Sequence, residues 1–303
     1  MLVCINCCLY ENFQCFADAF DPGCFYNLMN KNIKILSMNV RGLSNSKKRS
    51  DVFNWVKSKN PSIVCFQETH STNEIENKWQ DEWGSTCFFS HCDSKSAGVC
   101  VMFKRDLDYK VHDSKHDKDG RFIVLDLSIF DQRLTLTCLY GHNTDNPGFF
   151  SDILQCCLFY KNTSILLCGD WNVVQEKSID TFNILHDRNP NSRKKIEEII
   201  ETFDLIDPWR TCYPEDKKFT WRQPSPIKQS RIDYFLVSDD LFSLMVNTKI
   251  IPGYRTDHSA ILFCFSAYLA PRGKGYWKFN SRLLRDLEFV DKVKNCIKET
   301  VLE

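Results

Sequence analysis

Short apolar runs separated by polar turns recur along most of the chain, and this regular pattern begins at Ile33. Apolar runs of roughly 4–8 residues bounded by turn residues are typical of buried β-strands. Such strands are predicted over residues 33–38, 62–66, 98–103, 122–129, 134–140, 164–168, 232–237 and 260–265. The close spacing of the central strands favours antiparallel pairing.

Apolar residues at helical spacing lie between these strands. In the first such segment Val52, Phe53 and Val56 form one face, and Asn60-Pro61 ends the helix. Helices are predicted over residues 48–57, 73–83, 149–159 and 193–203. Two sheets with helices on their outer faces account for this order most economically. The sequence therefore predicts an α/β fold, a four-layer αββα sandwich of two mostly antiparallel sheets.

Three regions of the chain differ in pattern. Residues 1–32 have no clean period and hold five of the sixteen cysteines, so we expect a poorly ordered leader. Residues 33–266 carry the regular pattern and form the predicted domain. Residues 267–303 form a basic, aromatic tail, in which five Lys and Arg residues between positions 271 and 285 alternate with aromatic rings. That mixture suits contact with nucleic acid, and it also fits a solvated helix with packed aromatics.

Composition narrows the function only slightly. Lys+Arg and Asp+Glu are equal at 39 each, so the net charge favours no partner, although a local basic rim is enough for binding nucleic acid. Many cysteines lie within apolar strands, where reduced thiols behave as small hydrophobic groups, and this favours an intracellular protein. No apolar run approaches the roughly 20 residues of a membrane span, so we expect no membrane association.

Polar residues recur where the predicted strands begin or end. They are Asn39, Glu68, Tyr140, Asn143, Asp170, Asn172, Asp233, Asp257 and His258. Each alone is most simply a cap, a turn residue or a satisfied polar group of the core. Their joint recurrence favours a site, because the end of a strand holds a side chain rigidly and leaves it open to a ligand.

The residue types indicate a metal-assisted reaction. Oxygen ligands such as Glu68, Asp170, Asp257 and the Asn39 amide suit a hard cation, Mg²⁺ with Mn²⁺ as a substitute, better than zinc. Such a cation neutralises phosphate charge and stabilises a leaving oxyanion.

The remaining candidates supply proton transfer. His258, oriented by a carboxylate such as Asp233, could polarise a phosphoryl oxygen or act as a general acid–base. Asp170 could align or deprotonate a water molecule, and Asn172 could fix the phosphate. Together these groups describe phosphodiester hydrolysis.

Six ordered motifs resemble one family. They are Asn39-Val40-Arg41-Gly42-Leu43, Gln67-Glu68-Thr69-His70, Leu139-Tyr140-Gly141-His142-Asn143, Gly169-Asp170-Trp171-Asn172, Arg231-Ile232-Asp233 and Thr256-Asp257-His258-Ser259-Ala260. Over residues 33–265 the chain resembles the endonuclease/exonuclease/phosphatase superfamily, which includes exodeoxyribonuclease III and apurinic endonucleases. The resemblance implies a DNase I-like fold. Within it, the segment 57–62 that leads into Gln67-Glu68-Thr69-His70, the motif around His258 and the segment 276–280 are most similar to the apurinic-type endonuclease of LINE-type retrotransposon polyproteins. We therefore expect the chain to be a fragment of such an element or a truncated reading frame.

The resemblance also implies a role for each residue. Glu68 and Asn39 are implied as metal ligands with Asp257 nearby, and Asp170, Asn172, Asp233, His258 and Tyr140 as catalytic groups. Asn143, together with Tyr140 and Asn172, is implied to contact the phosphate. Arg41 departs from the pattern, because repair enzymes commonly place Asp or Asn there. This change argues against specialisation for abasic sites.

Four functions follow from these residues. The leading one is an Mg²⁺-dependent endonuclease that nicks double-stranded DNA to leave a 3′-hydroxyl, as retroelement insertion requires. An apurinic endonuclease with 3′–5′ exodeoxyribonuclease activity is the second, and an enzyme of the same fold that hydrolyses inositol phosphates or sphingomyelin is the third. A nucleic-acid-binding module with a decayed site is the fourth. We expect a monomer without an obligate protein partner, nuclear at least in part.

Overall fold

The computed structural model describes residues 31–92, 96–130, 132–186 and 188–267, together with Leu287, Val290, Asp291 and Lys294. The chain forms two units, residues 1–269 and residues 270–303. The predicted leader lies outside the described residues except for its last two residues, which belong to the first strand. Most of the predicted tail also lies outside them. In the second unit the four described residues are helical, and Lys294 pairs with Asp291 at 3.8 Å.

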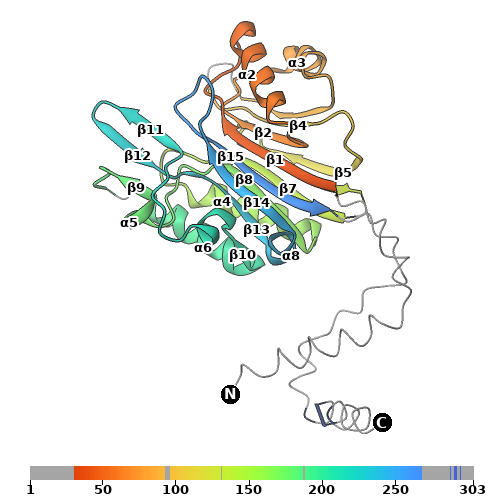
Figure 1. Cartoon of the computed structure of the whole chain (residues 1–303), viewed down its shortest axis with the longest axis vertical. Coiled ribbons are helices and arrows are strands. Elements are labelled where there is room, and N and C mark those ends of the chain that lie inside the picture. Colours follow the sequence, from red (N-terminus) through yellow and green to blue (C-terminus); the bar gives the residue numbers. More distant parts are fainter. Residues whose placement is uncertain are drawn as a thin grey trace. The chain divides into compact units, whose positions relative to one another are not determined.

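The first sheet has six strands, all antiparallel to their neighbours except the central parallel pair β1 and β2. Its order is β14 (Met245–Ile251), β15 (Ala260–Ala267), β1 (Lys31–Asn39), β2 (Ile63–Gln67), β4 (Val99–Phe103) and β3 (Cys87–Ser90). Helix α2 (Ser46–Ser58) and helix α3 (Glu76–Trp83), which follows the short 3₁₀ turn η2 (Asn73–Ile75), cover its outer face (Figure 1). The Asn45 side chain begins α2 by accepting a hydrogen bond from the Lys48 backbone.

The second sheet repeats this plan with one parallel pair, β7 and β8. Its order is β10 (Leu205–Ile206), β13 (Asp233–Ser238), β8 (Ser164–Asp170), β7 (Gln132–Tyr140), β6 (Phe122–Ile129) and β5 (Tyr109–His116). Helices α4 (Pro147–Tyr160) and α6 (Pro190–Phe203) cover its outer face (Figure 1). Three short helices, α5 (Lys177–Asp180), α7 (Pro208–Cys212) and α8 (Asp239–Ser243), connect the remaining strands. The predicted four-layer αββα sandwich is therefore confirmed.

Three apolar clusters fill the spaces between these four layers. In β15, Ile261, Phe263 and Phe265 belong to the cluster between the two sheets, whereas Ala260 and Leu262 face helices α2 and α3. Successive side chains of a strand point to opposite faces, so a strand that is covered on both faces must be apolar throughout. This is why the sequence shows continuous apolar runs at the central strands.

A third, three-stranded sheet was not predicted. It pairs β11 (Trp221–Pro224) with β12 (Ile227–Ser230), and β12 with β9 (Thr181–Phe182). The β11–β12 hairpin projects from the left of the sandwich in Figure 1. Its strands are mostly exposed or half-buried, and therefore they carry no apolar alternation that a sequence pattern could reveal.

The ten cysteines that the structure describes are free thiols, and most of them are buried. Burial disfavours the thiolate, and it raises the pKa of Cys157, for example, to about 12. These thiols therefore pack as small apolar groups. Within the described parts of the chain, no helix combines the length and the apolar character that crossing a membrane requires.

Phe263→Ala tests the core between the two sheets. Phe263 is fully buried and its ring lies 5.7 Å from that of Phe235, so truncation is expected to cost about 3–5 kcal/mol of unfolding free energy. Urea unfolding followed by circular dichroism measures this loss. Phe182→Ala, at a side chain that is 52% exposed, is the control and should change stability by less than about 0.5 kcal/mol. Equal losses for the two variants would contradict the packing described above.

Candidate active site

The polar residues predicted from the strand ends meet at one end of the sandwich. Because β1 runs parallel to β2, and β7 runs parallel to β8, their carboxyl ends lie at the same edges. Tyr140 is in register with Asp170, and Asp170 is in register with Asp233 on the neighbouring strand. His258 lies two residues before the start of β15. Topology thus brings together residues that are far apart in the sequence.

His258 is fixed between two aspartates. Its Nδ1 lies 2.9 and 3.1 Å from the two carboxylate oxygens of Asp233, and its Nε2 lies 3.8 Å from Asp170 Oδ2. A carboxylate can only accept hydrogen bonds, so Nδ1 carries a proton that it donates to Asp233. Asp170 in turn accepts a hydrogen bond from the Asn39 side-chain amide at 2.9 Å. All four side chains are almost fully buried.

Burial and mutual charge shift the protonation of this group. Burial raises the pKa of Asp170, and the negative charge of Asp233 raises it further, to about 7. Burial acts in the opposite direction on His258, but Asp233 and Asp170 outweigh it and raise the pKa of His258 to about 10. The raised pKa of His258 favours the protonated imidazole at neutral pH, and the raised pKa of Asp170 makes its carboxylate a better proton acceptor than an ordinary aspartate. Such a set of groups is suited to moving protons.

Glu68 follows β2 and is held by Tyr140, the strand neighbour of Asp170. The Tyr140 hydroxyl donates to Glu68 Oε1 at 2.5 Å, and the Arg121 guanidinium lies 5.0 Å from the centre of the Tyr140 ring. Burial, and then the negative charge of Glu68, raise the pKa of Tyr140 well above its usual value, so its hydroxyl stays protonated. Glu68 also has a positive φ of 52°, which turns the chain sharply after β2.

Asn172 and Asn143 lie on the loops beside Asp170. The Asn172 side chain donates to the carbonyl of Gly141 at 3.0 Å, and its backbone N–H donates to Asp170 Oδ1 at 3.1 Å. A Cβ at Gly141 would lie 2.0 Å from the carbonyl oxygen of Trp171, so only glycine allows these two loops to approach. Asn143 is exposed and lines the groove above them.

The oxygen ligands predicted for a metal ion all lie at the site, but they are engaged with protein groups. Asn39 Oδ1 accepts from the Arg41 backbone at 2.9 Å, and Arg41 Nη1 pairs with Asp257 at 3.5 Å. Among the described residues, the potential ligand atoms that lie within 4.8 Å of one another belong instead to Asp170, Asp233 and His258. Glu68 and Asp257 nevertheless line the groove, and their carboxylate oxygens, like the amide oxygen of the buried Asn39, are ligand types that fit a hard divalent cation.

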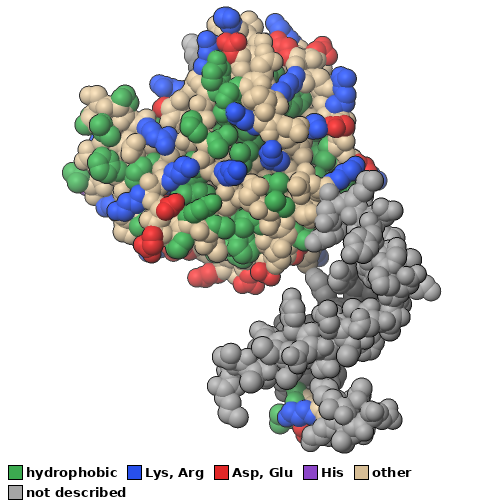
Figure 2. Space-filling model, viewed as in Figure 1, with side chains coloured by type: hydrophobic (Ala, Val, Ile, Leu, Met, Phe, Trp, Pro, Cys, Tyr) green, Lys and Arg blue, Asp and Glu red, His purple; other side chains and the backbone are tan. Residues whose placement is uncertain are grey.

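A groove of about 830 Å³ opens over this site. Glu68, Asp170 and His258 form its floor, and the projecting sheet forms one wall through Trp221 and Lys228. Further basic side chains, Lys177, Arg188 and Arg41 among them, also line the groove. Figure 2 shows Lys and Arg side chains spread over the middle of one face of the domain, with most Asp and Glu toward its rim. The groove is thus shaped and charged for an extended anionic ligand.

Three supporting residues escaped the sequence prediction. The Thr220 hydroxyl accepts hydrogen bonds from the backbone of residues 232 and 233, both at 3.0 Å. The Thr256 hydroxyl donates to the Asn39 carbonyl at 2.9 Å, and Arg121 stacks on Tyr140. Of these, only Thr256 lies within a motif, and nothing in the local sequence indicates that the other two support a site.

The fold and the arrangement of these residues define a class of protein. Residues 36–258 match the Endonuclease/Exonuclease/phosphatase family, and the chain therefore belongs to that family. The predicted superfamily is confirmed.

Curated relatives include a mobile element and two nucleases. The Transposon TX1 uncharacterized 149 kDa protein of Xenopus laevis is 26% identical over 87% of this chain, which spans only 20% of that protein. The exodeoxyribonuclease of Bacillus subtilis is 24% identical, with 69% of this chain aligned to 89% of that enzyme. A DNA-(apurinic or apyrimidinic site) endonuclease of Dictyostelium discoideum is 28% identical, with 74% and 66% covered. The chain thus spans about a fifth of the transposon protein.

Solved structures share the fold. The AP endonuclease LMAP from Leishmania major superimposes with a TM-score of 0.67 at 17% identity, covering 83% of this chain and 90% of that one. An AP endonuclease from Archaeoglobus fulgidus gives a TM-score of 0.61 at 19% identity, covering 77% and 99%. These likenesses confirm the DNase I-like architecture.

Proposed function

We propose that the protein is an Mg²⁺-dependent phosphodiesterase that hydrolyses the DNA backbone. The observation that carries this proposal is the convergence of Asp170, Asp233 and His258 with Glu68 at the floor of one open groove. Six of the nine residues predicted for the site line this groove, and the other three, Asn39, Tyr140 and Asp233, bond to Asp170, Glu68 and His258. A binding module with a decayed site would have lost some of them.

The residues divide the reaction between them. Asp170, which Asn39 orients, aligns the attacking water and accepts its proton, while protonated His258 faces the phosphate and stabilises its developing charge. Asp233 keeps the imidazole in its orientation. Asn172 and Asn143 contact the phosphate oxygens, and Tyr140 reaches the phosphate only if its hydroxyl proton turns from Glu68 to a phosphate oxygen.

A divalent cation completes this site. Glu68 and Asn39 would hold Mg²⁺, with Asp257 nearby, and the bound ion would neutralise phosphate charge and stabilise the leaving oxyanion. The carboxylate and amide oxygens fit this hard ion, and Mn²⁺ would substitute for it. The Tyr140 hydroxyl donates to Glu68 and thereby orients its carboxylate.

DNA is the favoured substrate, and a nick that leaves a 3′-hydroxyl is the favoured product. The similarity to a transposon protein over 87% of the chain supports a role in retroelement insertion, as a monomeric enzyme that acts in the nucleus on double-stranded DNA. A second candidate is an apurinic endonuclease with 3′–5′ exodeoxyribonuclease activity, which the likeness to 89% of a bacterial exodeoxyribonuclease supports. Arg41, paired with Asp257 at the floor of the groove, distinguishes this site from that of the repair enzymes.

Labelled duplexes separate these two candidates. With Mg²⁺, the protein is expected to nick an intact duplex at least as fast as the same duplex carrying an abasic analogue. A DNA polymerase should then extend the nicked strand without prior phosphatase treatment, because the product ends in a 3′-hydroxyl. Strong preference for the abasic duplex would support the repair function instead. A product that the polymerase extends only after phosphatase treatment would contradict the proposed chemistry.

A further inference from the structure

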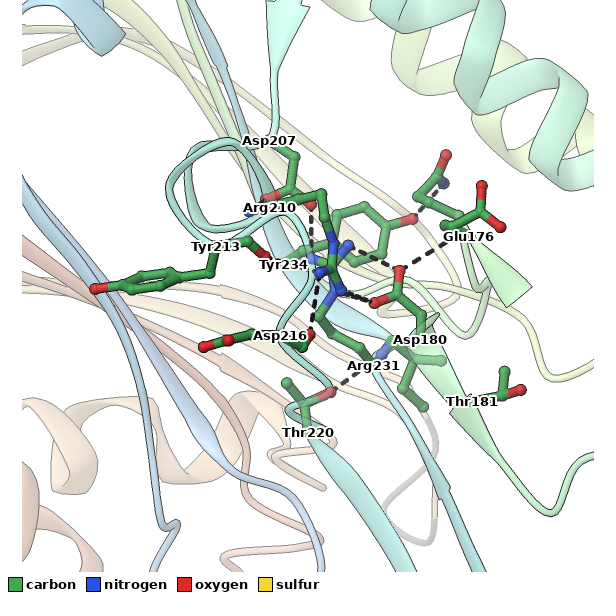
Figure 3. Close-up of polar contacts among 12 residues, drawn as sticks. Glu176, Asp180, Thr181, Asp207, Arg210, Tyr213, Asp216, Thr220, Arg231 and Tyr234 are labelled. Atoms are coloured by element: carbon green, nitrogen blue, oxygen red, sulfur yellow. Dashed lines mark hydrogen bonds and ion pairs between the residues drawn. The ribbon is translucent and has the colours of Figure 1, made fainter. Parts of the chain in front are cut away.

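A buried ion-pair network is centred on Arg231, two residues before the start of β13. Arg231, which is 1% exposed, donates from Nε and Nη2 to the two carboxylate oxygens of Asp180 at 2.7 and 2.9 Å. Its Nη1 donates to Asp207 at 2.6 Å, and Arg210 also donates to Asp180 (Figure 3). Two guanidinium groups and two carboxylates thus compensate one another inside the protein.

The network requires arginine at position 231. Burial disfavours the charge of Arg231, but Asp207 and Asp180 outweigh it and keep the pKa of the guanidinium above its usual value. Burying charged groups costs free energy unless each of them forms hydrogen bonds and ion pairs. Here the planar guanidinium of Arg231 donates hydrogen bonds to two carboxylates at once. A lysine ammonium keeps the charge but cannot form both contacts in this way.

The same contacts fix the backbone that leads into β13. Asp180 ends α5 immediately before β9, and Arg231 lies between β12 and β13. The Arg231 backbone N–H donates to the Asp180 carbonyl at 2.9 Å. The hydroxyl of Thr220, which precedes β11, accepts from the next two N–H groups, those of Ile232 and Asp233. All three strands of the projecting sheet are therefore anchored at residues 231–233.

We propose that Arg231 is a positioning residue, which holds the start of β13 so that Asp233 meets the His258 imidazole. Asp233 follows Arg231 by two residues, and its carboxylate accepts the Nδ1–H of His258. No side-chain contact joins Arg231 to His258 among those described, so the effect passes through the backbone. The wall of the groove and the catalytic imidazole consequently share one anchor. This inference rests on the proposed nuclease function.

Arg231→Lys in the full chain tests the proposal, because lysine keeps the positive charge but lacks the planar guanidinium that contacts both carboxylates. With saturating Mg²⁺ and an intact labelled duplex, kcat for nicking is expected to fall about 10–100-fold while KM changes less than about 3-fold. A loss of folded protein alone would lower the active fraction, which circular dichroism and active-site titration measure. Normalising to that fraction should leave the fall in kcat in place.

Arg133→Lys is the matched control. Arg133 also binds one carboxylate with two nitrogens, at 2.9 and 2.5 Å from Asp126, but it lies at the opposite end of β7 from Tyr140. Asp126 is buried, so this variant should lose stability and keep its kcat. A fall in kcat as large as that of Arg231→Lys would overturn the proposal, because any lost ion pair would then have the same effect.

A double-mutant cycle tests whether Arg231 affects catalysis through Asp233. If Arg231 acts through Asp233, then Arg231→Lys combined with Asp233→Asn should be no slower than Asp233→Asn alone. Multiplied losses, or a rise in KM at constant kcat, would overturn the proposal. Should Arg231→Lys fail to fold, Thr220→Val removes only the hydroxyl that anchors residues 232 and 233, and the same non-additivity is expected. Failure of the wild type to nick any DNA would instead overturn the nuclease function, and this inference with it.

Discussion

His258→Ala is expected to lower kcat for DNA nicking by about 10²–10³-fold, the usual cost of removing one group that stabilises charge developing in the transition state. The imidazole is buried between Asp233 and Asp170, and these carboxylates raise its pKa to about 10, so it meets the phosphate as a cation. Alanine removes that charge and leaves two neighbouring carboxylates without their cation. Single-turnover cleavage of a labelled duplex at saturating Mg²⁺ measures the loss directly.

The control for this variant is His112→Ala. His112 is an exposed histidine on β5 that bonds the Ser128 hydroxyl, and its loss should leave kcat unchanged. The account of His258 would be wrong if its alanine variant cut DNA at a rate within about 10-fold of the wild type, below the range for such a group.

Glu68→Gln is the second large effect that we expect. Replacing the carboxylate by an amide keeps the shape and removes the negative charge that would hold Mg²⁺, so the Mg²⁺ concentration giving half-maximal activity should rise sharply. At a fixed, low Mg²⁺ concentration the rate should fall about 10²-fold or more, the equivalent of losing several kcal/mol of charge stabilisation. Raising Mg²⁺, or substituting Mn²⁺, should recover part of the activity.

Binding of the ion can be followed apart from catalysis. Calorimetric titration with Mn²⁺ should show one site lost or weakened in Glu68→Gln and retained in Glu74→Gln, an exposed carboxylate on the η2 turn. Equal Mn²⁺ affinities for the wild type and Glu68→Gln would show that Glu68 is not a ligand of the metal ion. The cluster of Asp170, Asp233 and His258 would then be the next set of ligands to test.

The central strands were predictable because a strand that is buried on both faces is apolar at every position, which gives a continuous apolar run in the sequence. Residues 260–265 are all apolar, because alternate side chains of this strand pack against the second sheet on one face and against the helices on the opposite face. The β11–β12 hairpin has no such covering, and in β5 only Tyr109 and Val111 are hydrophobic residues packed against the core. Neither gives a hydrophobic pattern, so both were absent from the prediction.

The residues of the site and the pairing of Asp233 with His258 were predicted from the sequence, but the other contacts of the site were not. The ordered motifs indicated Asp170, Asp233 and His258 as site residues. Only the register of β8 with β13 shows that Asp170 and Asp233 are neighbours. The partners of Arg231 are 51 and 24 residues away in the sequence, and no local pattern connects them. Contacts of this kind depend on topology, which one sequence does not display.

Relaxation of supercoiled plasmid in Mg²⁺ is the measurement that tests the central claim most directly. The wild type should convert the plasmid to open circles, EDTA should stop the reaction, and His258→Ala and Glu68→Gln from parallel preparations should leave the plasmid supercoiled. If the wild type binds the plasmid but leaves it supercoiled in both Mg²⁺ and Mn²⁺, the protein is a DNA-binding module and not a nuclease.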